Sequence, residues 1–233
     1  MTVKAGIVAI DGQAAAGKTA VGRELARRLG CPFLDTGIMY RAITWLALRE
    51  SVRIDDASGL GKLACGCSMR LTDAEGGAIL LNDIQLGPEL RSAQVDEHVS
   101  LVARVTGVRR ALVRQQRDIA TQSAQDLGGI VMVGRDIGTV VLPDADLKVF
   151  MVAAPEVRAR RRYDELVSQG QGADYQQILA NAQARDKIDS ERDDSPLAQA
   201  SEALVIDTSD LTIDQVVERV LEGFASGKSG AGL

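Results

Sequence analysis

The stretch "IVAIDGQAAAGKTAVGRELARRLG", residues 7–30, constrains the fold more than any other part of the chain. A short apolar run ends at an acidic residue, passes through a loop of Gly, Gln and Ala, and enters a helix-like pattern. Gly12, Gly17, Lys18 and Thr19 satisfy the pattern G-x-x-x-x-G-K-[ST] without a mismatch. Such glycines let successive backbone N–H groups point into one hollow, which also receives the positive end of the helix dipole. The stretch is therefore predicted to be a phosphate-binding loop.

The residues of this loop are the candidate nucleotide ligands. Lys18 is expected to reach the β- and γ-phosphates of a nucleotide, and the Thr19 hydroxyl is expected to hold Mg²⁺. The flanks agree, since residues 7–10 predict a buried strand and Gly30 stands where the helix should end. A second Gly-Lys-Ser near the C-terminus is different, because Glu222 occupies the position of its first glycine. The predicted nucleotide-binding residues are Gly12, Gln13, Ala14, Ala15, Ala16, Gly17, Lys18, Thr19 and Ala20.

The charge and length of the chain exclude several classes of partner. The net charge of −5 argues against bulk binding of nucleic acid or of an anionic membrane. The longest apolar runs are too short to span a bilayer, and the N-terminus lacks a signal-peptide pattern. We therefore expect a cytoplasmic protein without a nucleic-acid or membrane partner. We also expect it to act as a monomer.

The scarcity of histidine and cysteine restricts the chemistry. His98 is the only histidine, which excludes most Ser-His and Cys-His nucleophile pairs and His-rich metal sites. Cys31, Cys65 and Cys67 suggest neither a disulfide framework nor a zinc site, so buried or half-buried reduced thiols are expected. Phosphoryl transfer remains compatible, because it depends on positioning and positive charge rather than on an imidazole.

The order of apolar runs predicts an α/β fold. Strand-like runs at 32–34, 130–133, 147–152 and 203–207 alternate with helical patterns, and the two middle runs suit central parallel strands. The predicted architecture is a three-layer P-loop NTPase fold in which helices cover both faces of a parallel central sheet. Ligands of such sheets bind at the carboxyl ends of the strands. We expect residues 1–233 to form one such domain.

Two segments depart from this alternation. "CSMRLTDAEGGAILLND" contains two strand-like runs around a Gly-Gly turn, which predicts an antiparallel hairpin within an inserted subdomain at 66–95. Four arginines between residues 158 and 162 fit either a charged helix face or a mobile lid at 157–173. Between them, residues 95–124 read as helical with an interruption near 106–107, and the last residues, 226–233, resemble a disordered tail.

Arginine and aspartate recur where the predicted strands end. "LDTGIMYR" and "GRDIG" each follow a strand, and in "ARDKIDSERDDSPL" Asp189 falls one helical turn after Arg185. Each group alone also fits a structural interpretation: a helix N-cap at 35–36, a surface salt bridge at 135–136, and an ion-paired helix at 185–192. A forked guanidinium group binds phosphate bidentately, so their joint placement beside a phosphate loop favours a binding site.

These stretches resemble bacterial cytidylate kinases. "IDGQAAAGKT", "LDTGIMYRA", "GRDIGTVVLPDADLKVFM" and "RDKIDSERDDSPL" occur in the order and at the spacing of that family, and the likeness spans nearly the whole chain. "GRDIGTVV" is its most specific part, whereas the phosphate loop specifies only the superfamily. The resemblance implies an enzyme of pyrimidine nucleotide metabolism that uses ATP and Mg²⁺ to convert CMP and dCMP to CDP and dCDP.

The resemblance also implies a role for residues on the acceptor side. Thr36 and Arg41 resemble contacts to the acceptor nucleotide, and Thr36 keeps the hydroxyl that Ser supplies in many members. Ser100, Arg109 and Asp136 match positions that hold the cytosine. The base-reading residues are thus expected to come from distant parts of the chain.

A second set of positions matches contacts to the sugar and the phosphates. Arg185 and Asp189 match ribose contacts, Arg135 resembles a phosphate-side contact, and Arg192 matches a further charge beside the acceptor. The predicted catalytic residues are Lys18, Arg135 and Arg192, because positive charge must offset the repulsion between two polyanions.

Other classes of nucleotide-binding protein fit less well. A regulatory GTPase needs a guanine-reading N-K-x-D, an ABC-type motor needs L-S-G-G-Q, and an adenylate kinase is expected to show D-G-[FY]-P-R; the chain has none of these. Two alternatives stay open on the residues alone: a kinase of another small acceptor, such as shikimate or a nucleoside, and a nucleotide-binding module without activity.

Overall fold

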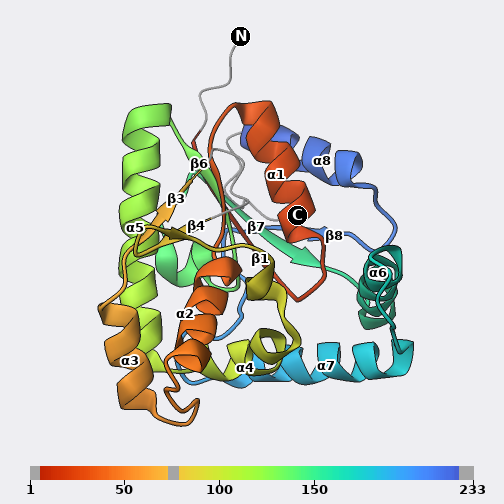
Figure 1. The fold of residues 1–233 in the computed structure, drawn as a ribbon. Helices are drawn as coiled ribbons and strands as arrows, with labels where there is room; N and C mark the ends of the chain where they lie inside the picture. The colour runs from red at the N-terminus through yellow and green to blue at the C-terminus, as the bar shows by residue number, and fades with distance from the viewer. Residues whose placement is uncertain (1–5, 73–78, 226–233) are drawn as a thin grey trace. The chain divides into compact units, whose positions relative to one another are not determined.

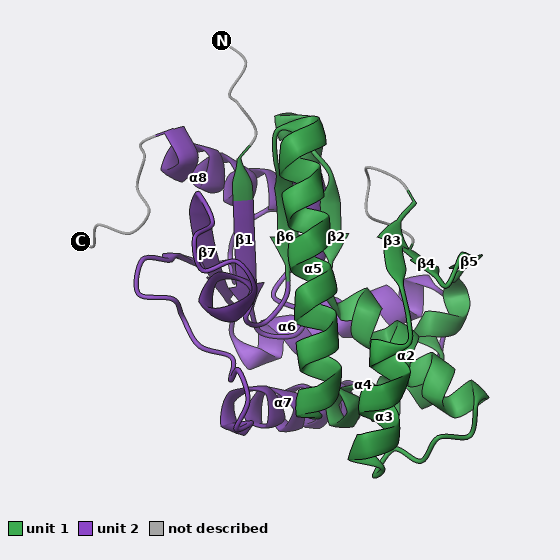
Figure 2. Cartoon of the chain, turned by 90° about the vertical axis from the view of Figure 1, so that its left-hand side faces the viewer, with its two compact units in different colours: residues 1–7, 26–133 green, residues 8–25, 134–233 purple. Residues whose placement is uncertain are grey.

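The computed structural model describes residues 6–72 and 79–225 and divides the chain into two compact units (Figure 2). One unit comprises Met1–Ile7 and Ala26–Val133, and the other comprises Val8–Leu25 and Gly134–Leu233. The phosphate loop therefore belongs to the second unit, whereas the predicted insertion at 66–95 belongs to the first. The single domain, the inserted subdomain and the lid at 157–173 remain predictions.

The larger sheet confirms the predicted α/β class (Figure 1). Its five strands follow one another in the order β2-β6-β1-β7-β8, and β2 with β6, β1 with β7, and β7 with β8 pair in parallel. All four residues of β6 are buried, as expected for an apolar strand between two layers of helices. The strands are β1 (Ile7–Gly12), β2 (Phe33–Asp35), β6 (Ile130–Val133), β7 (Leu147–Val152) and β8 (Leu204–Asp207).

The helices of the first unit pack against one another, and α5 also packs against the larger sheet. The long helix α5 lies against α3, β3 and β6, and α2 packs against α3 and α4. The chain leaves the helical conformation between α4 and α5, close to the predicted interruption, and Gly128 ends α5 with a left-handed φ of +79°. The elements are α2 (Gly37–Arg49), α3 (Ala57–Cys65), the 3₁₀ helix η1 (Pro88–Arg91), α4 (Ala93–Val102) and α5 (Thr106–Leu127).

A small antiparallel sheet confirms the predicted hairpin. Strand β3 (Met69–Leu71) pairs with β4 (Ile79–Leu81), and the predicted Gly-Gly turn between them lies outside the described residues. A third strand, β5 (Ile84–Gln85), pairs with β4 across Asn82 and Asp83, which both have positive φ. The sequence did not predict β5, because two residues are too few to establish an alternation of apolar and polar side chains.

The second unit carries the remaining helices. Helix α1 (Lys18–Leu29) continues from the phosphate loop and ends before Gly30, as predicted, while its last residues fall in the first unit. Helices α6 (Pro155–Ser168) and α7 (Tyr175–Glu191) pack against each other. Helix α8 (Ile213–Ala225) covers β7 and β8 with buried valines. The predicted tail at 226–233 lies outside the described residues.

The three free cysteines differ in burial. Cys31 and Cys67 are buried as predicted, and burial raises the pKa of the Cys31 thiol to about 11. Burial also raises the pKa of Cys67. The prediction is wrong for Cys65, which is exposed, because it is the last residue of α3 and follows the buried Ala64 on the helix surface.

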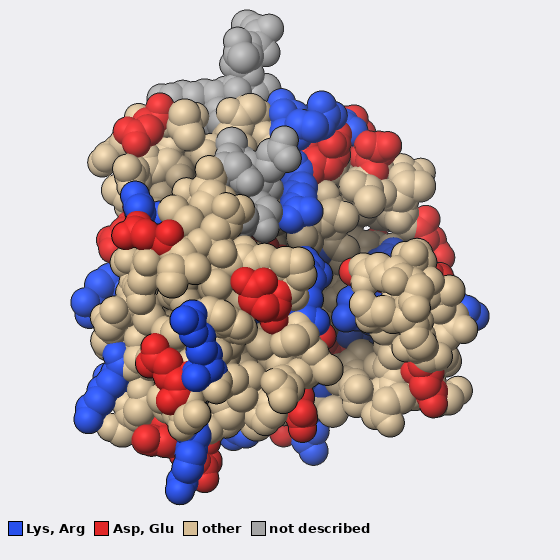
Figure 3. Space-filling view, viewed as in Figure 1, with Lys and Arg blue, Asp and Glu red and all other residues tan. Residues whose placement is uncertain are grey.

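The surface carries charges of both signs. Figure 3 shows Lys and Arg together with Asp and Glu on the face that it draws. Among the helices of residues 6–72 and 79–225, none is both long enough and apolar enough to cross a membrane.

Gly12, the last residue of β1 and the first of the phosphate loop, lies very close to the backbone of the neighbouring strand β7. Its φ is +146°, and a Cβ there would lie 2.1 Å from the carbonyl oxygen of Met151 on β7. We expect Gly12→Ala to lower the free energy of unfolding by about 4 kcal/mol or more. Gly170→Ala is the control, since φ is +70° there but no described atom lies within 4 Å of a Cβ, so only about 1 kcal/mol should be lost. Equal losses in urea titrations of the two variants would contradict this role of Gly12.

Candidate active site

The phosphate loop turns between β1 and α1 with an unusual backbone. Gly17 has a φ of +93°, and Ala15 has a φ of +58°, which a non-glycine residue adopts only rarely. Such a path turns the chain directly into the first turn of α1. The first N–H groups of a helix point out of its N-terminus, here toward the loop, and groups in that position are suited to bind an anion.

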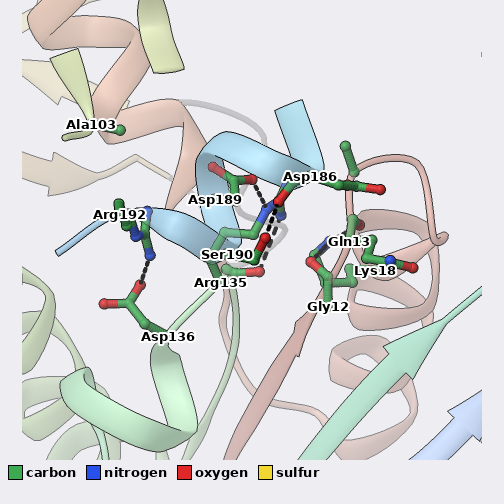
Figure 4. A network of polar contacts seen from close by, with 12 residues as sticks. Gly12, Gln13, Lys18, Ala103, Arg135, Asp136, Asp186, Asp189, Ser190 and Arg192 are labelled. Atoms are coloured by element: carbon green, nitrogen blue, oxygen red, sulfur yellow. Dashed lines mark hydrogen bonds and ion pairs between the residues drawn. The ribbon is translucent and has the colours of Figure 1, made fainter. Parts of the chain in front are cut away.

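Lys18 is held beside the first residues of this loop (Figure 4). The side chain is only 7% exposed, and its Nζ donates to the carbonyl oxygens of Gly12 at 2.7 Å and of Gln13 at 2.5 Å. The ammonium group is therefore held at the start of the loop. A single positive charge in this place suits a ligand whose phosphates face the loop.

Asp11, immediately before the loop, is a functional candidate that the sequence analysis did not single out. Its carboxylate is buried and accepts hydrogen bonds from the backbone N–H of Ile137 at 2.8 Å and of Gly138 at 2.7 Å. Burial raises the pKa of Asp11 to about 6, and the charge of Asp136 adds to this rise, while the two N–H groups and Lys18 oppose it. The sequence feature that could have identified Asp11 is an acidic residue at the end of an apolar strand.

The Arg and Asp residues predicted after β6 and at 185–192 meet within the second unit, whereas Asp35 and Arg41, predicted after β2, belong to the first unit. Arg135 Nε donates to Asp189 Oδ2 at 2.8 Å, and Arg192 Nη2 lies 3.6 Å from Asp136 Oδ1 (Figure 4). Asp136, Asp189 and Arg192 are all buried. Their pairing excludes the interpretation of residues 135–136 and 185–192 as separate surface ion pairs.

The charge of Asp189 is stabilised by this arrangement. Burial by itself would raise the pKa of Asp189, but the guanidinium groups of Arg135, Arg185 and Arg192 outweigh it and hold the pKa below its usual value. The carboxylate therefore stays ionised near neutral pH. It orients the guanidinium groups around it rather than serving as a proton donor.

Arg158 is a second functional candidate, and its position differs from the charged helix face that was one interpretation of the 158–162 cluster. It is 1% exposed rather than part of a solvated helix face. Its guanidinium contacts Ala153 O at 3.0 Å, Ala14 O at 3.2 Å and Asp186 Oδ2 at 2.7 Å. Arg158 thereby ties the phosphate loop to α7, a role that spacing along α6 could not reveal.

Thr208, just after β8, forms a hydrogen bond to Ala16 in the phosphate loop. Its hydroxyl donates to Ala16 O at 3.1 Å and accepts from Arg161 Nη1 at 3.1 Å. A Cβ at Gly17 would lie 3.9 Å from the same Arg161 nitrogen, so this guanidinium lies near the loop. In contrast, Arg160 is exposed and lies over the rings of Tyr163 and Tyr175.

Thr36 occupies the N-cap position of α2 in the first unit. Its side chain makes no capping hydrogen bond; instead its Oγ1 donates to Val133 O at 2.9 Å. The preceding Asp35 accepts from Gly37 N at 3.0 Å and so takes up the capping role. The predicted N-cap at 35–36 is thus provided by Asp35 alone.

The other acceptor-side candidates of the first unit lie on α2, α4 and α5. Arg41 donates to Leu90 O at 2.9 Å and pairs with Asp96 at 2.6 Å. Arg109 is 2% exposed, donates to Ala103 O at 3.3 Å and lies 5.7 Å from the centroid of the Tyr40 ring. Ser100 is half-buried on α4. Arg109 differs from its cluster neighbours, which are exposed on α5: Arg110, Arg114 and Arg117.

The donor atoms at the loop fit a nucleotide that carries Mg²⁺. Thr19 is half-buried in the first turn of α1 and supplies a single hydroxyl oxygen. The carboxylate of Asp11, the residue before the loop, is already bound to two backbone N–H groups. One protein oxygen suits Mg²⁺, which keeps water and substrate phosphates as its other ligands.

A phosphate loop after the first strand of a parallel sheet, with buried arginines beside it, defines the chain as a P-loop phosphotransferase. The family model described as "Cytidylate kinase" matches residues 8–226. The chain therefore belongs to the cytidylate kinase family, which confirms the resemblance and decides against the two alternatives left open by the sequence.

Individual relatives agree with this assignment. The chain is 45% identical to a cytidylate kinase of Exiguobacterium sp. over 92% of its own length and 96% of that protein. It is 43% identical to a cytidylate kinase of Rhodococcus opacus over the whole of both chains. An uncharacterised protein of Eubacterium ventriosum has a similar fold, with a TM-score of 0.51 at 12% identity over 94% of this chain and 98% of that chain.

The raised pKa of Asp11 makes stability depend on pH in a defined direction. Between about pH 4 and 6 the folded chain binds more protons at Asp11 than the unfolded chain does, so this contribution to stability falls as pH rises through that range. We expect the stability of the protein relative to Asp11→Asn to be greater at pH 4 than at pH 7, measured by urea unfolding. Asp118→Asn, at an exposed position of α5, controls for the loss of a carboxylate. A difference for Asp11→Asn that does not change with pH would contradict the raised pKa.

Proposed function

We propose that this chain transfers the γ-phosphoryl group of ATP to CMP, and also to dCMP, in pyrimidine nucleotide metabolism. The observation that carries the proposal is the combination of the Lys18 loop with the buried cluster of Arg135, Asp136, Asp189 and Arg192 in one compact unit. Membership in the cytidylate kinase family makes the chain a kinase and supports CMP as the acceptor.

The proposed chemistry requires positive charge rather than a strong base. A phosphate monoester has a second pKa of about 6, so the attacking oxygen of the acceptor is already largely deprotonated at neutral pH. The repulsion between two polyanions is the main barrier. We assign Lys18, Arg135 and Arg192 as the catalytic residues that offset it.

The donor is assigned to residues 12–20. Backbone N–H groups and Lys18 would bind the phosphates, and Arg158 and Thr208 would keep the loop carbonyls turned away from them. Thr19 would hold Mg²⁺, which supplies further positive charge to the β- and γ-phosphates when bound.

The acceptor is assigned to the residues that the resemblance to cytidylate kinases implies. Thr36 and Arg41 would contact the acceptor nucleotide, and Arg185 and Asp189 its ribose. Ser100, Arg109 and Asp136 would read the cytosine. The burial of Arg109 and Asp136 supports this assignment, because buried polar groups discriminate strongly between bases that pair with them and bases that do not.

The proposal also covers the oligomeric state, the location and the closure of the enzyme. We propose a monomer in the cytoplasm whose partners are its nucleotide substrates. Closure of segments 66–95 and 157–173 would exclude water, and thereby prevent hydrolysis of ATP, once both substrates are bound.

Loss of the Lys18 charge should abolish transfer without preventing folding. We expect Lys18→Ala to reduce kcat with ATP and CMP by about a thousandfold or more, while CMP still binds in equilibrium titrations. Lys62→Ala, which removes an exposed lysine from α3, is the matched control and should turn over normally. Near-normal turnover of Lys18→Ala would remove this residue from the mechanism.

The choice of base tests the role of Asp136. Its carboxylate can accept from the N4 amino group of cytosine but would face the O4 lone pairs of uracil, so CMP should be preferred to UMP by roughly tenfold to a hundredfold. Asp136→Asn adds an amide donor and should reduce this ratio of kcat/KM values while ATP binding changes less.

Asp144→Asn, at an exposed position of the same unit, provides the comparison for the Asp136 variant. It should leave the ratio of kcat/KM for CMP and UMP unchanged. An unchanged ratio in Asp136→Asn as well would mean that other residues read the base.

A further inference from the structure

We propose that Asp11 is a positioning residue that holds Asp136 in place to read the acceptor base, and so connects the donor loop to acceptor selection. This inference rests on the proposed role of Asp136 in base recognition. It assigns a function to a buried carboxylate that the phosphate loop pattern does not include.

The first support is the use of both Asp11 oxygens. Oδ1 accepts from Ile137 N and Oδ2 accepts from Gly138 N, at 2.8 and 2.7 Å. These N–H groups belong to the first residues of the π-helix η2 (Ile137–Val141), where backbone donors lack partners within the helix. Asp11, 126 residues away from Ile137 in sequence, therefore caps this helix.

The second support is that Asp136, which stands where the capping residue of η2 is expected, does not cap this helix. Asp136 stands at the N-cap position of η2, yet its side chain makes no capping hydrogen bond. Its Oδ1 lies 3.6 Å from Arg192 Nη2 instead. Because Asp11 takes over the cap, the carboxylate of Asp136 is turned toward Arg192, which the proposed function assigns as a catalytic residue.

The third support is the continuity between Asp11 and the donor loop. Gly12 follows directly, and its carbonyl oxygen accepts from Lys18 Nζ at 2.7 Å. Gly134, which precedes Arg135 and Asp136, donates from its backbone N–H to Ile10 O at 3.0 Å. The end of β1 is thus bonded both to Lys18, through the carbonyl of Gly12, and to the turn that carries Asp136, through the carbonyl of Ile10.

The experiment compares Asp11→Asn with Val8→Ala. The asparagine side chain keeps one acceptor but presents its amide N–H₂ to the second backbone N–H. We expect the ratio of kcat/KM for CMP and UMP to fall roughly tenfold, with the KM for CMP rising and the KM for ATP little changed. Hydrogen exchange at the amides of Ile137 and Gly138 should become faster. Val8→Ala, a buried change on the same strand, should lower stability and leave the ratio unchanged.

A double-mutant comparison separates positioning from a general loss of structure. In the Asp136→Asn background, Asp11→Asn should cause no further loss of the CMP-to-UMP ratio, because the residue that it positions is already altered. Asp11→Ser keeps one acceptor in a smaller side chain and serves as a second variant if Asp11→Asn does not fold. The same loss of ratio is expected.

Two outcomes would overturn the inference in different ways. If Asp136→Asn lowers the ratio but the foldable Asp11 variants do not, Asp11 does not position Asp136, and the proposed function stands. If Asp136→Asn itself leaves the ratio unchanged, the base-reading role fails and this inference fails with it.

Discussion

The two hydrogen bonds from Ile137 and Gly138 to the carboxylate of Asp11 join the two loops on which the proposed chemistry depends. One loop starts at Gly12 and carries Lys18; the other contains Arg135 and Asp136. A buried carboxylate without such donors would be costly, and two unpaired N–H groups at the start of η2 would be costly as well. Each satisfies the other, so the end of β1 and the turn after β6 are held in a single arrangement.

Buried charged groups need hydrogen-bonding partners, and the arginines of the second unit have them as well. Arg158 is fully buried against Asp186 and the carbonyl of Ala14, and Arg135 pairs with Asp189. Buried charges persist only when they are paired and hydrogen-bonded, so Asp186 and Asp189 make the burial of these guanidinium groups tolerable. In an acidic protein, positive charge is thereby concentrated where two polyanions are proposed to react.

Arg158 and Arg135 differ in burial, and we expect them to have different roles for that reason. Arg158 has its hydrogen-bonding capacity directed at the protein, and it shapes the loop. Arg135 keeps about a fifth of its side chain exposed beside Asp189. A guanidinium group that is both oriented and partly accessible can bind a phosphate without first being ordered, which lowers the entropy cost of binding.

The sequence by itself determined the phosphate loop, the central strands, the limits of α1 and the family. These features depend on local patterns: apolar periodicity, glycines at a fixed spacing, and motifs of adjacent residues. The candidate residues on α7 were also visible as a helical spacing. Only the tertiary structure decided the burial of Arg158, the exposure of Cys65, the short strand β5 and the partners of Asp11. These depend on contacts between segments far apart in the chain, or on which side of a helix meets its neighbour, and no local pattern encodes either.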